Sequence, residues 1–373
     1  MTRRAVAWLV VVCGLALASL SPAAAQTGPD GSDQAGAPPD AGPTPRPGFP
    51  YGVLVADIGS APRAQAAGFR VLASTVSWSR TEPKRGQYPF EQKDQYGRTA
   101  ANDVTNLINA ASGNGMKFGF RLIDPPAWAG GSPARVNPAD LEDYAFHVVQ
   151  YAHGSLAYFE LFNEQNLVSE WGGPPDPAAY ARLIAAAYRG VKRADPSIPV
   201  VNAGPSQRTG GRDGSIEDVD WLDGFLAAGG ASSVDALGVH AYLGAFDPGT
   251  DPSCQPLCFR EVEQFRAVMD RYGDAQPMYI TEFGALENTS TGLGQFDWMK
   301  LPSDERAAFL VKALEMADTY PWMAGATLFN LDYAAAGRPP TSEQFWFSLL
   351  DESRSPRPAY TRIAQARSSG DLP

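Results

Sequence analysis

Two glutamates end separate apolar runs of the sequence, and their types and spacing could do acid–base chemistry. Glu164 follows the apolar run at residues 156–162, and Glu282 lies in the run at 277–283. A pair of carboxyl groups, one kept protonated and one ionised, can cleave a glycosidic bond. Glu160 lies only four residues before Glu164, but a strand separates such residues by about 13 Å, too far for a working pair. We therefore predict that Glu282 is the partner of Glu164.

Glu160 shares the strand parity of Glu164 and should also point into the protein. A buried charge needs a partner, and Arg121, on the preceding apolar run, is the candidate. The alternative is that Glu160 faces a helix and reaches solvent.

The elements that must position these residues alternate along the chain. Eight apolar runs predict strands, at 51–57, 70–77, 117–123, 156–162, 199–204, 236–242, 277–283 and 325–331. Between and after them, amphipathic segments predict helices at 138–153, 176–194, 261–273, 303–320 and 358–369, with capping residues Asn137 or Asp140, Asp176 and Ser303. Strands apolar on both faces are typical of a parallel sheet covered by helices.

The predicted fold class is α/β, a single (β/α)8 TIM barrel. A doubly wound open sheet is the rival, but no Gly-rich phosphate loop follows the first strand. Barrel enzymes carry their chemistry at the carboxyl ends of the strands. The substrate-binding candidates at and near these ends are Asn163, His240, Tyr242, Trp78, Trp128, Trp171, Asn330 and Trp346. We expect Tyr242 to donate to Glu282 and Asn163 to bond a sugar hydroxyl, while each Trp suits sugar stacking and core packing alike.

Several stretches together resemble the clan-A glycoside hydrolases. They are FELFNEQN followed by EW, YITEFGA, ALGVHAY, STVSWSRTEPKRGQY and PPAWAGG, and the similarity to cellulase-like and family 39-like bacterial glycosidases covers residues 51–362. The resemblance implies that Glu164 is the acid/base and Glu282 the nucleophile. It also implies that Asn163 contacts the sugar 2-hydroxyl and that His240 and Tyr242 line the nucleophile side.

One departure concerns the eighth strand, which ends in Trp in many clan members. Here residues 327–330 read Thr-Leu-Phe-Asn, and Trp346 is the aromatic residue expected to fill the gap. Because of this departure, the resemblance does not indicate which sugar the protein binds.

The sequence thus predicts a secreted retaining glycoside hydrolase that cleaves β-linked O-glycosidic bonds of a polysaccharide or oligosaccharide. No metal or organic cofactor is expected. Two alternatives use the same barrel: a non-catalytic carbohydrate-binding protein and a transglycosylase.

Net charge and the terminal segments indicate which partners the protein has and where it acts. With 30 basic and 41 acidic residues the net charge is −11, which argues against nucleic acid and anionic membrane as partners. Residues 1–25 have the basic start, apolar run and small-residue end of a signal peptide, and 26–48 form a Pro/Gly-rich linker predicted to be disordered. The catalytic domain is expected at 49–373, as a secreted or cell-envelope monomer with no membrane anchor in its mature form. Cys254 and Cys258 predict a local disulfide.

Overall fold

The computed structural model describes residues 49–90, 104–207, 210–253 and 257–372 of the chain. The predicted signal peptide (1–25) and linker (26–48) lie outside these residues, as does Cys254.

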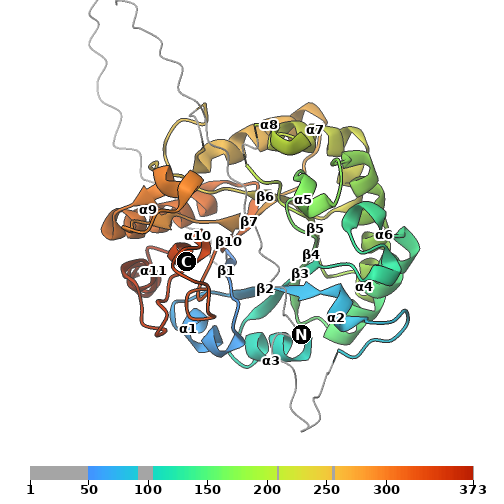
Figure 1. Cartoon of the computed structure of the whole chain (residues 1–373), viewed down its shortest axis with the longest axis horizontal. Coiled ribbons are helices and arrows are strands. Elements are labelled where there is room, and N and C mark those ends of the chain that lie inside the picture. The colour runs from blue at the N-terminus through green and yellow to red at the C-terminus, as the bar shows by residue number, and fades with distance from the viewer. Residues whose placement is uncertain (1–48, 91–103, 208–209, 254–256, 373) are drawn as a thin grey trace, which may run out of the picture.

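Eight parallel strands form the centre of the protein (Figure 1). Their order in the sheet is β5-β4-β3-β2-β1-β10-β7-β6. The bounds are β1 Tyr51–Leu54, β2 Val71–Ser77, β3 Lys117–Ile123, β4 Leu156–Leu161, β5 Val200–Asn202, β6 Leu237–His240, β7 Met278–Phe283 and β10 Met323–Leu328. All eight predicted strands are present, and the predicted (β/α)8 barrel is confirmed.

The barrel is nearly closed between its first and last strands in sheet order, β5 and β6. A bridge joins Val201 to Ala236. The side chain of Asn202 then takes the place of further backbone pairing, because its amide accepts from Gly238 N at 2.9 Å and donates to Gly238 O at 3.0 Å. A side chain that mimics a peptide group thus bonds the short edge of β5 to β6.

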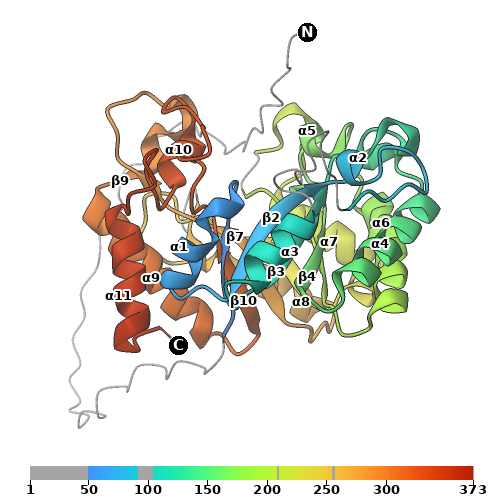
Figure 2. The same ribbon diagram turned by 90° about the horizontal axis from the view of Figure 1, so that it is seen from below.

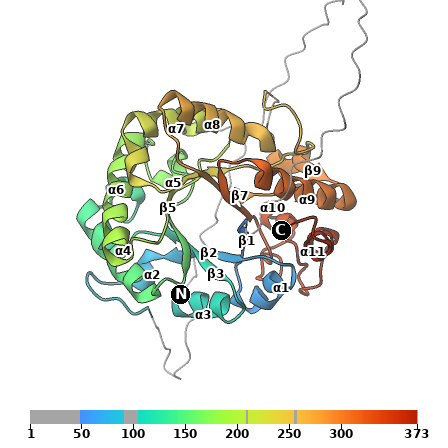
Figure 3. The same ribbon diagram turned by 180° about the vertical axis from the view of Figure 1, so that it is seen from behind.

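Helices surround the barrel, and each strand is followed by one (Figures 1 and 3). The bounds are α1 Ala61–Ala66, α3 Val104–Ser112, α4 Pro138–Ala152, α6 Pro177–Ala194, α7 Asp218–Ala227, α8 Val262–Arg271, α9 Ser303–Thr319 and α11 Pro358–Ser369. The five predicted helices are confirmed. The sequence reasoning missed α1, α3 and α7, which have six to ten residues and so offer little periodicity.

The helix caps agree with the sequence in two cases and differ in one. Asn137 accepts from Ala139 N at the start of α4, and Asp176 accepts from Ala179 N at the start of α6. The predicted cap Ser303 is wrong, because the cap position of α9 is occupied by Pro302. The Ser303 hydroxyl instead donates to Glu287 Oε1 at 2.6 Å.

Short helices and a two-stranded sheet lie at the carboxyl ends of the barrel strands. Figure 2 shows α2 (Trp78–Thr81), α5 (Val168–Trp171) and α10 (Glu343–Phe347) at one end of the barrel, together with β9 (Lys300–Leu301), which pairs with β8 (Leu286–Glu287). Among the described residues, no helix combines the length and apolarity that a membrane span requires.

Candidate active site

The segment after β4 presents Glu164 through a tight turn. The backbone of Glu164 has φ +43°, a left-handed conformation uncommon for residues other than glycine. Two residues further on, Asn166 fixes the turn to the loops after β5. Its amide donates to Ser206 O at 2.8 Å and Ile216 O at 2.9 Å, and it accepts from Ser206 N at 2.7 Å. These three bonds hold the chain at the end of β4.

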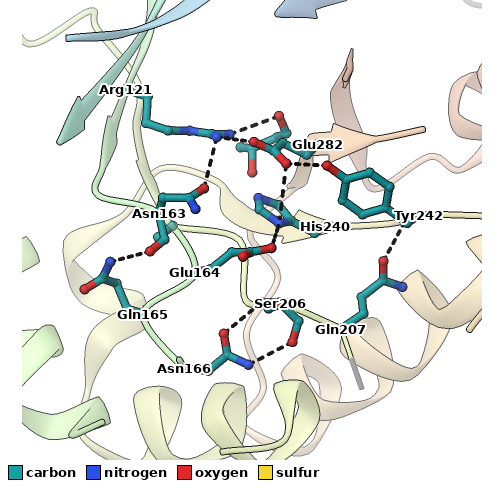
Figure 4. Close-up of polar contacts among 12 residues, drawn as sticks. Arg121, Asn163, Glu164, Gln165, Asn166, Ser206, Gln207, His240, Tyr242 and Glu282 are labelled. Carbon is teal, nitrogen blue, oxygen red and sulfur yellow. Dashed lines mark hydrogen bonds and ion pairs between the residues drawn. The ribbon is translucent and has the colours of Figure 1, made fainter. Parts of the chain in front are cut away.

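Glu164 itself has one side-chain hydrogen bond and one free oxygen. Its side chain is buried, and Oε1 lies 3.0 Å from His240 Nδ1 (Figure 4). Oε2 is buried as well, and within the described residues it has no hydrogen-bond partner. A buried carboxyl oxygen without a partner is a group that a bound molecule can satisfy.

Glu282 is surrounded by donors. Arg121 Nη1 donates to its Oε1, and the Tyr242 hydroxyl donates to its Oε2 at 2.6 Å (Figure 4). The Tyr242 contact is the one expected from the sequence. Burial acts to raise the pKa of Glu282, but the charges of Arg121 and His240 and the hydrogen bonds from Tyr242 and Arg121 outweigh it and hold this pKa below its usual value.

His240 lies between the two glutamates. Its Nδ1 is 3.0 Å from Glu164 Oε1 and 3.9 Å from Glu282 Oε2, so these oxygens are at most about 7 Å apart. That limit is compatible with the ~5–5.5 Å spacing of the carboxyl groups in retaining glycosidases. Burial acts to lower the pKa of His240, but the negative charges of Glu282 and Glu164 raise it above its ordinary value.

Arg121 joins the site to the interior of the barrel. Its Nε donates to Glu160 Oε2 at 2.7 Å, and its Nη1 donates to Asn163 Oδ1 at 3.1 Å. Nη2 donates to the Thr281 carbonyl at 3.2 Å. The predicted pairing of Glu160 with Arg121 is therefore present, and Glu160 is buried rather than exposed on a helix-facing side. The link from Arg121 to Glu282 was missed, because β3 and β7 lie apart in the sheet and residue spacing says nothing about contacts across a barrel.

Gln207 is a second supporting residue that the sequence did not reveal. Its Oε1 accepts from Tyr242 N at 2.5 Å, and its Nε2 donates to Glu261 Oε2 at 2.6 Å. Gln207 therefore fixes the backbone that carries the Tyr242 hydroxyl toward Glu282.

Three of the other predicted binding residues are buried. Trp78 is 0% exposed and donates its Nε1–H to Glu82 Oε2 at 2.7 Å, and Trp171 is 3% exposed. Asn330 is 0% exposed, and its amide bonds Gln344 O and accepts from Tyr333 N within its own loop. Burial of this kind leaves Trp78 and Trp171 packing in the core and Asn330 bracing its loop.

Trp128 and Trp346 remain partly exposed. Trp128 donates to Glu82 O at 3.0 Å, and Trp346 donates to Pro340 O at 2.8 Å. The guanidinium of Arg357 lies 5.1 Å from the Trp346 ring centroid. Of the four Trp residues predicted to stack on a sugar, Trp128 and Trp346 are the two whose rings are partly exposed and could contact a ligand.

Cys258 is disulfide-bonded. Its expected partner Cys254 lies outside the described residues.

Comparison with known proteins identifies solved structures of similar fold. No protein-family model matches the chain. A family 39 glycoside hydrolase from Bacteroides cellulosilyticus WH2 is 21% identical, with a TM-score of 0.63 over 86% of this chain and 64% of that one. A monomeric β-xylosidase from Caulobacter crescentus CB15 is 20% identical, with a TM-score of 0.56 over 88% and 69%.

A third solved structure is an endo-β-1,4-glucanase from Xanthomonas axonopodis pv. citri carrying three substitutions. It is 13% identical, with a TM-score of 0.57 over 85% of this chain and 98% of that one. The chain thus shares its fold with glycoside hydrolases, while it spans 64% of the length of the family 39 protein.

Proposed function

We propose that the protein is a retaining glycoside hydrolase in which Glu282 is the nucleophile and Glu164 the acid/base. The observation that carries this proposal is the pair of buried carboxyl groups within about 7 Å of each other in opposite surroundings. Donors on both oxygens keep Glu282 ionised, whereas Glu164 has a free oxygen and shares a hydrogen bond with His240.

In the first step, the Glu282 carboxylate attacks the anomeric carbon and forms a glycosyl ester. The bond from that carbon to the glycosidic oxygen breaks, and the leaving oxygen takes a proton from Glu164 Oε2. His240 Nδ1 lies 3.0 Å from Oε1, the other oxygen of Glu164, which leaves Oε2 to carry the transferred proton. Because Arg121 and Tyr242 bond the two oxygens of Glu282, the carboxylate is oriented before the sugar arrives.

In the second step, water replaces the leaving group. Glu164, now ionised, takes a proton from the water, whose oxygen attacks the anomeric carbon and expels Glu282 as a carboxylate. Two inversions give net retention. We propose that Asn163, whose Oδ1 accepts from Arg121, bonds the sugar 2-hydroxyl.

The substrate we propose is a β-linked polysaccharide or oligosaccharide. Structures of similar fold include a β-xylosidase and an endo-β-1,4-glucanase, so both exo and endo action on β-linked chains occur on this barrel. Trp128 and Trp346 provide partly exposed rings for pyranose stacking.

We further propose that the protein is exported and acts as a monomer. A signal peptide over residues 1–25 accords with the disulfide at Cys258, because disulfides persist in oxidising compartments.

Two measurements test the function. Digestion of a glycan panel, with product sizing and NMR detection of the first-formed anomer, should give a cleaved β-linked substrate and a retained configuration. An activated 2-deoxy-2-fluoro glycoside matched to that substrate should then label Glu282, identified by peptide mass spectrometry. Binding without cleavage would indicate the carbohydrate-binding alternative, and an inverted product or a label elsewhere would contradict the mechanism.

A further inference from the structure

Tyr242 lies two residues beyond the end of β6, at a point where β5 has already ended at Asn202. The residues before and after Tyr242 donate their backbone N–H to carbonyls on the β7 side, at 2.8 and 3.0 Å. Because successive residues of a strand alternate in the direction of their backbone N–H, that of Tyr242 faces the β5 side. Gln207, in the loop after β5, supplies the acceptor there, since its Oε1 accepts from Tyr242 N at 2.5 Å (Figure 4).

Gln207 can serve Tyr242 in only one of its two amide orientations. A side-chain amide has an acceptor oxygen on one side and two N–H donors on the other. With the oxygen on Tyr242 N, the Nε2 of Gln207 donates to Glu261 Oε2 at 2.6 Å. Half a turn of the amide would set donor against donor at Tyr242 and acceptor against acceptor at Glu261, so both bonds would be lost together. The Glu261 carboxylate therefore decides which way the amide of Gln207 faces.

Glu261 immediately precedes α8 but bonds the loop after β5. It is 0% exposed and holds the N-cap position of the helix. An acidic side chain at a helix N-terminus commonly bonds the N–H groups of the first turn, yet that of Glu261 makes no such cap bond. Its contact is with Gln207, 54 positions earlier in the chain. Because burial of a carboxylate costs free energy unless hydrogen bonds offset it, this contact matters to both residues.

A continuous chain of bonds follows. It runs from Glu261 through Gln207 to the backbone of Tyr242, whose hydroxyl donates to Glu282 Oε2 at 2.6 Å. All four residues are buried, so these bonds are formed away from bulk water. A carboxyl group at the start of an outer helix is thereby linked to the carboxyl group proposed to attack the sugar.

We propose that Glu261 is a positioning residue of the reaction, fixing through Gln207 the backbone from which the Tyr242 hydroxyl reaches Glu282. This proposal rests on the proposed function. Glu261 acts through its neighbours and needs no contact with the sugar.

A charge-swapped pair of variants tests the proposal. Glu261→Met removes the acceptor of Gln207 at similar volume and leaves the amide able to turn. Gln207→Glu sets two carboxyl groups against each other. The double variant Gln207→Glu/Glu261→Gln exchanges donor and acceptor between the two positions, so an oxygen is again held toward Tyr242 N.

The readout is the kcat/KM–pH profile on the cleaved aryl glycoside. Glu261→Met and Gln207→Glu should each lower kcat/KM by about 10-fold. Both should also move the acid limb to higher pH, because the hydrogen bond from Tyr242 helps to lower the pKa of Glu282. The double variant should return to within about 3-fold of wild type. In a Tyr242→Phe background, Glu261→Met should move the acid limb no further.

Glu263→Met is the matched control, since Glu263 is in the first turn of the same helix and pairs with Arg260 at 2.8 Å. It should leave the acid limb in place. An unmoved acid limb in folded Glu261→Met, or a double variant as impaired as Gln207→Glu alone, would overturn the proposal. Should Glu261→Met fail to fold, the comparison of Gln207→Glu with the double variant decides.

An NMR readout separates failure of this proposal from failure of the proposed function. In protein with isotope-labelled tyrosine, the backbone amide signal of Tyr242 is assigned by its loss in Tyr242→Phe. This signal should shift in Glu261→Met and return in the double variant, because the bond to the Tyr242 N–H is first lost and then remade. If the wild type cleaves no glycoside, the proposed function fails, and this signal still decides the positioning. A signal that stays in place in Glu261→Met would show that Glu261 does not hold Gln207 on Tyr242.

Discussion

On the β7 side of the barrel mouth, Arg121 and Tyr242 bond both oxygens of Glu282. On the β4 side, Glu164 bonds His240 through Oε1, and its Oε2 has no partner among the residues that the structure describes. Both side chains are buried. Equal burial thus accompanies different surroundings, and the donors around Glu282 hold its pKa below the usual value.

Arg121 shows how the same cation serves two glutamates unequally. It bonds Glu160 inside the barrel and Glu282 at the mouth. Burial raises the pKa of Glu160 although Arg121 and His240 act to lower it, while the pKa of Glu282 falls because Arg121, His240 and the hydrogen bond from Tyr242 together outweigh burial. The lowered pKa of Glu282 therefore depends on several partners acting together.

Removing each carboxyl group in turn should give the largest effect. Glu282→Ala should lower kcat on the order of 10⁴-fold or more on every substrate, because the attacking group is gone. Glu164→Ala should lose as much on substrates with poor leaving groups. On a dinitrophenyl glycoside, whose departure needs no proton, its kcat/KM should fall far less, while its kcat still falls because the second step lacks a base. Steady-state kinetics on the two substrate types distinguishes the roles.

Added azide sharpens this test. It should restore turnover in both variants with opposite stereochemistry, giving an inverted glycosyl azide from Glu282→Ala and a retained one from Glu164→Ala. Interchanged products would assign the two roles the other way round.

Replacing Arg121, which bonds both Glu160 and Glu282, should have the second-largest effect. Arg121→Met leaves Glu160 and Glu282 buried without their partner, and we expect a loss of about 3–5 kcal/mol in the free energy of unfolding. Adding Glu160→Gln should recover part of that stability without recovering kcat, since Glu282 still lacks Arg121. Urea unfolding and kinetics on both variants measure the two quantities. Recovery of full activity in the double variant would show that Arg121 acts only through Glu160.

Replacing His240 tests the residue between the two sides. His240→Asn should lower kcat by about 10²-fold, because Glu164 loses the side chain that holds its Oε1 in place. The pKa of Glu282 should rise as its positive neighbour disappears, so the acid limb of the kcat/KM–pH profile should move to higher pH. An unchanged acid limb would exclude His240 as a partner of Glu282.

The barrel and the strand-end positions of the two glutamates could be predicted from the sequence because their signals are local. Apolar runs of strand length repeat eight times, and Glu164 and Glu282 each stand at the end of one. The pairing of Glu160 with Arg121 was also accessible, because adjacent strands in register bring the two residues opposite each other.

Contacts across the barrel and through its loops could not be predicted in this way. Arg121 reaches Glu282 over 161 positions, and Gln207 supports Tyr242 from a loop after β5. The Trp residues failed as signals for a different reason. An indole suits a sugar face and a core equally well, and only the burial of Trp78 and Trp171 separates them from Trp128 and Trp346.

The smallest expected effect is that of the Tyr242 hydroxyl. Tyr242→Phe removes one hydrogen bond to the ionised Glu282, which we expect to cost about 1.5–3 kcal/mol of unfolding free energy at pH 7. Since the folded pKa of Glu282 is lowered, its stabilising contribution is present above the unfolded pKa and is lost as the pH falls through the folded one. The difference between variant and wild type should therefore shrink in acid, as urea unfolding at pH 7 and near pH 3 would measure. A difference that stays constant over this range would mean that the hydroxyl stabilises the fold through packing, and that the nucleophile side depends on Arg121 and His240 alone.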